Sequence, residues 1–128
     1  MQLNDMGLLR TKAYIDGKWC DADSGATFPV INPATGEVIA EVAKCGQAET
    51  RRAIEAADKA LPAWRSKTAK ERAAVMRKWF ELIIEAKDDL AMIMTLEQGK
   101  PLAEAAGEIL YGASFVEWFG EEAKRLYG

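Results

Sequence analysis

Histidine is absent from this sequence of 128 residues, and cysteine occurs only twice. Without histidine the chain cannot form a Ser-His or Cys-His catalytic pair, and it lacks a common nitrogen ligand of zinc. Cys20 and Cys45 are too few for a disulfide framework, and we expect no secretory signal in the first ten residues. We therefore expect both thiols to be reduced and structural, and composition alone indicates no enzyme.

Long apolar runs and clusters of positive charge are also missing. No apolar stretch approaches the ~20 residues that span a bilayer. The chain carries 17 Lys and Arg against 20 Asp and Glu, without a basic run, whereas phosphate binding needs clustered cations. We therefore expect no membrane partner, no nucleic-acid partner and a cytoplasmic location.

The N-terminal part, residues 1–45, has the pattern of two β-hairpins. Asp16-Gly17 is a strong signal for a two-residue turn, and Asn32-Pro33-Ala34-Thr35-Gly36 favours a longer one. The expected strands on either side of these turns are residues 12–15 and 18–20, and residues 27–31 and 37–43.

The remainder, residues 46–128, changes to helical spacing of its apolar residues. We expect Pro62 to end or kink the first helix, Thr68-Ala69-Lys70-Glu71 to cap the second, and Gly99 to end the third. The last helix is expected from Pro101 to about Leu126. The fold class is therefore α+β, with two hairpins followed by three or four α-helices.

The last helix has two apolar stripes, which indicates that it is sandwiched between neighbours or lines a space. One stripe is Leu102, Ile109, Ala113 and Val116, and the other is Gly107, Tyr111, Ser114 and Trp118. Because exposed apolar patches usually find a partner, we expect the chain to self-associate.

Three segments, in this order, resemble the start of NAD(P)-dependent aldehyde dehydrogenases. They are Asn32-Pro33-Ala34-Thr35-Gly36-Glu37, then Leu61-Pro62-Ala63-Trp64, and then Thr95-Leu96-Glu97-Gln98-Gly99-Lys100-Pro101. Residues 113–119 and 121–125 look most like the bacterial succinate-semialdehyde dehydrogenases, which oxidise succinate semialdehyde to succinate with NAD+ or NADP+.

The resemblance implies that residues 1–128 are the N-terminal part of an α/β NAD(P)-binding dehydrogenase domain. In that family a cysteine thiolate attacks the aldehyde and hydride passes to nicotinamide, and the catalytic groups follow the position of residue 128. Cys45 does not match the nucleophile, because it precedes a Gly-Gln pair instead of following it. We therefore expect no catalysis and no binding of NAD or NADP by this chain alone, and an aldehyde substrate and a homo-oligomer for the full-length parent.

Two sites are also implied by the resemblance. Gly107 and Tyr111 match residues that line the substrate tunnel, although helix packing is the alternative. The backbone carbonyls of Val30 and Ile31 and the side chain of Glu97 match ligands of a sodium or potassium ion, and hard cations prefer such oxygens. The alternative is that the Asn-Pro segment is only a turn and that Glu97 pairs with Lys100 in solvent.

A stand-alone helical interaction module is the competing function. The last helix carries five carboxylates, which we expect to form a solvated face or ion pairs with Lys124 and Arg125, not acid–base pairs. They are Glu104, Glu108, Glu117, Glu121 and Glu122.

Overall fold

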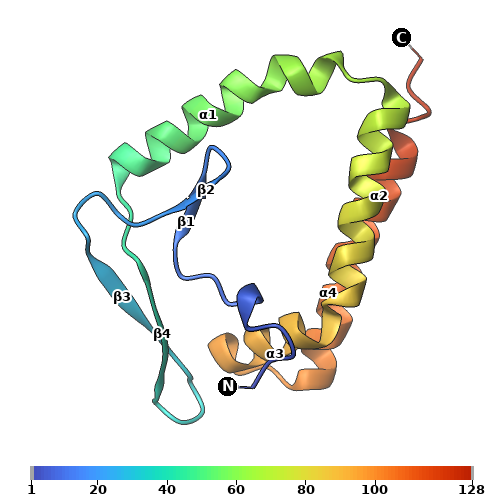
Figure 1. Ribbon diagram of the computed structural model, residues 1–128. Helices are drawn as coiled ribbons and strands as arrows, with labels where there is room; N and C mark the ends of the chain where they lie inside the picture. Colours follow the sequence, from blue (N-terminus) through green and yellow to red (C-terminus); the bar gives the residue numbers. More distant parts are fainter. Residues whose placement is uncertain (1, 128) are drawn as a thin grey trace.

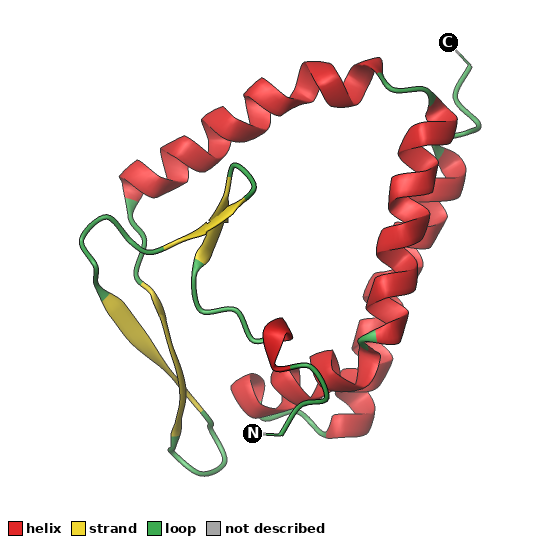
Figure 2. Cartoon of the chain, in the orientation of Figure 1, coloured by secondary structure: helices red, strands yellow, loops and turns green. Residues whose placement is uncertain are grey.

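The structure is a computed structural model that describes residues 2–127, and it confirms the α+β class. Two small antiparallel sheets precede four α-helices (Figures 1 and 2). The elements are the 3-10 helix η1 (Met6–Leu8), strands β1 (Ala13–Ile15), β2 (Lys18–Cys20), β3 (Thr27–Ile31) and β4 (Val38–Ala43), and helices α1 (Gln47–Ser66), α2 (Ala69–Glu85), α3 (Lys87–Gln98) and α4 (Leu102–Glu122).

Both expected hairpins are present. Asp16 and Gly17 have φ values of 50° and 76°, the left-handed conformation that a tight turn between twisted strands requires. Strands β3 and β4 pair around the turn that begins at Asn32. The ladder has a register shift, because Val30 pairs with Ala40 while the next residue, Ile31, pairs with Val38.

Of the two outcomes predicted for Pro62, an end or a kink of the first helix, the end is wrong, because α1 continues to Ser66. Proline removes one N–H donor and leaves a carbonyl one turn earlier without its partner. The carbonyl residue, Asp58, is exposed, so water can satisfy that oxygen and the helix can pass through Pro62. The next helix begins as expected, since Thr68 and Glu71 each accept the other's backbone N–H.

The last two helices have the boundaries that the sequence predicts, except at the end of α4. Gly99 ends α3 in the left-handed conformation, with φ of 83°. Helix α4 ends at Glu122 instead of Leu126, because the chain tightens into bonds between residues three apart, from Lys124 N–H to Glu121 O and from Arg125 N–H to Glu122 O.

Helices α2 and α4 lie side by side and run antiparallel, with α3 across one end of the pair (Figure 1). Their contact is made by small residues, which allow the helix backbones to approach closely. Ala73 of α2 is buried, as are Ala105, Ala113 and Gly120 of α4. Ala91 of α3 is buried too. The Arg77 guanidinium of α2 bridges to Glu117 of α4, with 3.3 Å between nitrogen and oxygen.

The N-terminal segment is fixed to the start of α3, next to which it lies in Figure 1. The buried carboxylate of Asp89 accepts the backbone N–H groups of Asn4 and Asp5, at 2.9 and 2.8 Å. Within residues 2–127, no helix combines the length and the apolar character needed to cross a membrane.

Candidate functional site

One face of α4 is buried against the other helices, and the opposite face is free. At about 100° per residue, Ala105, Ala113 and Gly120 point to the same side of the helix. These residues are buried, whereas Gly107, Tyr111, Ser114 and Trp118 lie on the other side and are exposed. Helix packing within this chain therefore does not explain Gly107 and Tyr111.

The sequence predicted the two stripes of α4, with one error. Ala113 is buried and Ile109 and Val116 are half-buried, as expected for the packed stripe, but Leu102 is exposed at the helix start. The expected ion pairs with Lys124 and Arg125 are confirmed, and their partners are Glu121 and Glu122. Glu108 pairs with Lys100, which the sequence did not predict.

On the free face, Gly107 contributes no side chain, and the aromatic residue Tyr111 follows one turn later. A Cβ atom added at Gly107 would meet no neighbouring atom within 4 Å. Tyr111 is 65% exposed, and its ring packs edge to face with Phe115. The face thus combines a glycine, which has no side chain, with an exposed phenol.

The turn after β3 contacts the end of α3. A Cβ atom added at Gly99 would lie 2.8 Å from Cγ of Pro33, so the proline ring occupies the space beside the glycine. Asn32 is buried and its Oδ1 accepts the N–H of Ala34 at 2.9 Å, which fixes the turn. The structure therefore places the Asn-Pro turn against the residue that ends α3.

The expected ligands of that site have the right kinds of oxygen. Val30 and Ile31 flank the register shift, where the regular pairing of the strand is interrupted. Glu97 is exposed in the last turn of α3, whose carbonyl end favours positive charge. Among residues 2–127 no three His, Cys, Asp or Glu side chains form a metal cluster, so a cation here would need main-chain oxygens.

The alternative pairing of Glu97 with Lys100 is wrong. The ammonium of Lys100 forms its ion pair with Glu108 of α4, across the turn between α3 and α4. The side chain of Lys100 is only 22% exposed. Glu97 is therefore not neutralised by this lysine.

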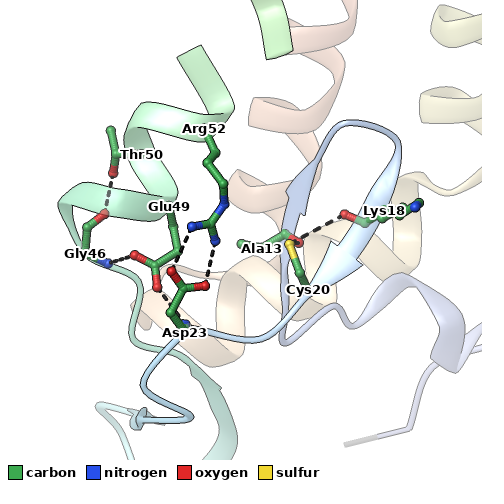
Figure 3. A network of polar contacts seen from close by, with 8 residues as sticks. All are labelled: Ala13, Lys18, Cys20, Asp23, Gly46, Glu49, Thr50 and Arg52. Carbon is green, nitrogen blue, oxygen red and sulfur yellow. Dashed lines mark hydrogen bonds and ion pairs between the residues drawn. The ribbon is translucent and has the colours of Figure 1, made fainter. Parts of the chain in front are cut away.

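A second polar network joins the loop after β2 to the start of α1 (Figure 3). The carboxylate of Glu49, 5% exposed, accepts the backbone N–H groups of Asp23 at 2.7 Å and Gly46 at 2.9 Å. Arg52 forms a two-pronged ion pair with the carboxylate of Asp23, with both distances at 2.7 Å. The network fixes the loop to the first turn of the helix.

These contacts lower the pKa of both carboxyl groups. For Glu49 the largest cause is the N–H of Asp23, followed by that of Gly46. For Asp23 it is the hydrogen bond from Arg52. A carboxyl group with a lowered pKa stabilises the fold above its ordinary pKa, and this contribution is lost as the pH falls through the lowered value. The network therefore serves stability at neutral pH and fails only in acid.

Cys45 is exposed and lies beside this network. Partial desolvation, followed by the negative charge of Glu49, raises its pKa. Since the thiolate is the nucleophilic form, a raised pKa disfavours attack on an aldehyde. The other thiol, Cys20, donates a weak hydrogen bond to the Ala13 carbonyl at 3.4 Å.

Sequence reasoning missed Glu49 and Asp89. Glu49 stands three residues after Gly46, the spacing of a helix-start carboxylate, so the signal was present in the sequence. Asp89 has no such signal, because its partners Asn4 and Asp5 lie more than eighty residues away.

The chain does not offer the usual cradle for a dinucleotide. Its ten glycines form no G-x-G-x-x-G pattern. The strands described within residues 2–127 form two antiparallel hairpins and no parallel sheet, whereas the dinucleotide motif joins a strand of a parallel sheet to a helix.

Solved structures share this arrangement of hairpins and helices. The succinate-semialdehyde dehydrogenase of Burkholderia pseudomallei is 62% identical and matches the whole chain with a TM-score of 0.96. This chain covers 27% of that one. The class is thus the aldehyde dehydrogenase fold, of which the chain contains the first hairpins and helices.

Residues 19–128 match the aldehyde dehydrogenase family, and the chain belongs to this family. Over its whole length it is 71% identical to glutarate-semialdehyde dehydrogenase of Pseudomonas putida and 60% identical to succinate-semialdehyde dehydrogenase [NADP(+)] of Escherichia coli. It spans 27% of each, about a quarter of the length of these relatives. The resemblance to semialdehyde dehydrogenases is therefore confirmed.

Proposed function

We propose that residues 1–128 form the N-terminal part of the dehydrogenase domain of a cytoplasmic, homo-oligomeric NAD(P)+-dependent enzyme that oxidises succinate semialdehyde to succinate. The support is the identity to relatives that act on semialdehydes. Glutarate semialdehyde is a second candidate substrate, because relatives with that activity are 70% and 71% identical. The stand-alone interaction module is disfavoured by the match of the whole chain to enzymes.

The observation that carries the proposal is the free face of α4. Gly107 and Tyr111 point away from the packed stripe, and no described residue covers Gly107. We propose that this face forms a wall of the substrate tunnel in the full-length enzyme. The chain itself would supply no catalytic group and would contribute to binding and to the shape of the tunnel.

Replacing Gly107 by leucine in the full-length enzyme is expected to raise the KM for succinate semialdehyde about tenfold or more, because the new side chain would occupy the tunnel. The α4 helix itself has room for the side chain, so the fold should persist. Steady-state formation of NAD(P)H measures the effect, and thermal melting verifies folding.

Gly112 offers a matched control for this experiment. A Cβ atom there also meets nothing within 4 Å, but Gly112 lies five residues further on and therefore on another face. Gly112→Leu should leave the KM unchanged. A folded Gly107→Leu enzyme with the wild-type KM would show that this face is not the tunnel wall.

We also propose a monovalent cation site formed by the Val30 and Ile31 carbonyls and the Glu97 carboxylate. The contact between Pro33 and Gly99 supports it, since it places the strand end next to the helix end. Glu97 would supply the negative charge that makes a partly desolvated cation tolerable. The role of such an ion would be structural, joining the second hairpin to α3.

A Glu97→Gln variant of the full-length enzyme tests the cation site by thermal melting. The wild type should melt about 2–4 °C higher in potassium or sodium chloride than in tetramethylammonium chloride, because an ion that binds only the folded state stabilises it. The variant should lose this difference. Equal melting of wild type and variant in all three salts would exclude the site.

A further inference from the structure

Two aromatic rings stand together on the free face of α4. The ring centroids of Tyr111 and Phe115 are 4.9 Å apart and the ring planes are perpendicular. In this geometry the positive edge of one ring meets the negative face of the other, which adds to the energy of apolar contact. Because Tyr111 is exposed, Phe115 is the neighbour that restricts the orientation of its ring.

Two polar groups near Tyr111 have partners. Ser114 donates its hydroxyl to the Tyr111 carbonyl at 2.6 Å. Lys100 is paired with Glu108, one turn before Tyr111, whereas Glu104, two turns before Tyr111 on the same side of α4, is exposed. No hydrogen bond within residues 2–127 uses the Tyr111 hydroxyl. The phenol is therefore a donor that a ligand on this face can use.

We infer that Phe115 is a positioning residue that orients Tyr111, and that the Tyr111 hydroxyl donates a hydrogen bond to the anionic end of the aldehyde substrate. This inference rests on the proposed function. A hydrogen bond from a phenol to a carboxylate is charge-assisted and shorter than one between neutral groups. It lies at the end of the substrate opposite the reacting carbonyl, so it selects aldehydes with a distal anion without taking part in the chemistry.

The test compares succinate semialdehyde with butanal, an uncharged aldehyde of the same chain length, in the full-length enzyme. Tyr111→Phe should raise the KM for the semialdehyde about tenfold more than the KM for butanal, because only the semialdehyde has the anionic end that the hydroxyl contacts. Phe115→Leu keeps apolar bulk but removes the ring, and should raise the KM for the semialdehyde about threefold. Phe115→Tyr retains the ring edge and should keep the wild-type value.

The double variant Tyr111→Phe with Phe115→Leu distinguishes positioning from independent packing. If Phe115 acts through the Tyr111 hydroxyl, the double variant should be no worse than Tyr111→Phe alone. Additive losses, or a Tyr111→Phe effect that is equal for both aldehydes or absent, would overturn the inference.

The Gly107→Leu variant distinguishes failure of the inferred Tyr111 contact from failure of the proposed function. If that variant raises the KM for both aldehydes while Tyr111→Phe changes neither, the tunnel wall stands and the hydroxyl contact is wrong. If the wild-type enzyme oxidises neither aldehyde, or if Gly107→Leu leaves both KM values unchanged, the proposed site fails and this inference fails with it.

Discussion

Replacing Gly99 by alanine is expected to lower the free energy of unfolding by about 2–4 kcal/mol. Gly99 has φ of 83°, where a residue with a Cβ atom costs about 1–2 kcal/mol. The added Cβ would also lie 2.8 Å from Cγ of Pro33, so the Asn-Pro turn or the end of α3 must shift. Urea unfolding of the chain, followed by far-UV circular dichroism, measures the loss.

A Gly36→Ala variant separates the two causes of the loss at Gly99, which are the left-handed backbone conformation and the contact with Pro33. Gly36 has φ of 75°, close to that of Gly99, but no atom lies within 4 Å of an added Cβ. Gly36→Ala should therefore show only the backbone cost of about 1–2 kcal/mol. Equal losses for the two variants would mean that the contact between the hairpin turn and α3 does not contribute to stability.

Replacing Gly120 by leucine is expected to destabilise the fold by about 3 kcal/mol. Gly120 is buried between α2 and α4, and an added Cβ would lie 3.0 Å from Cβ of Met76. The helix backbones would have to separate, which would also disturb the neighbouring contacts of Ala73 and Ala113.

Gly112→Leu on the same helix should change the stability in the opposite direction. The position is exposed and open, so the higher helix propensity of leucine should stabilise the chain by up to about 1 kcal/mol. The difference in urea midpoint between the two variants measures how closely α2 and α4 pack. A Gly120→Leu chain as stable as Gly112→Leu would contradict the packing of these helices.

The features that the sequence predicted are those decided by a few neighbouring residues. Asp16-Gly17 defines a tight turn by its own backbone preference, and Thr68 with Glu71 caps a helix within one turn. The course of the chain through Pro62 was mispredicted, because solvent replaces the partner that proline removes.

The features that could not be predicted depend on contacts between distant segments. Nothing local to Asp89 indicates that it will accept N–H groups from the N-terminus, and nothing local to Gly99 indicates that Pro33 will lie against it. Likewise, periodicity identified two stripes on α4, but only the packed structure shows that the Gly107 stripe is the free one.

The most direct test of the proposed account is the formation of NAD(P)H from succinate semialdehyde or glutarate semialdehyde. It should be measured at equal molar concentrations for the full-length protein and for the 128-residue chain, with NAD+ and with NADP+. The full-length protein should turn over, and the chain should not exceed a buffer blank, because its sequence has no dinucleotide loop and its Cys45 thiol has a raised pKa. Turnover by the pure chain, or a folded full-length protein that oxidises neither semialdehyde, would contradict it.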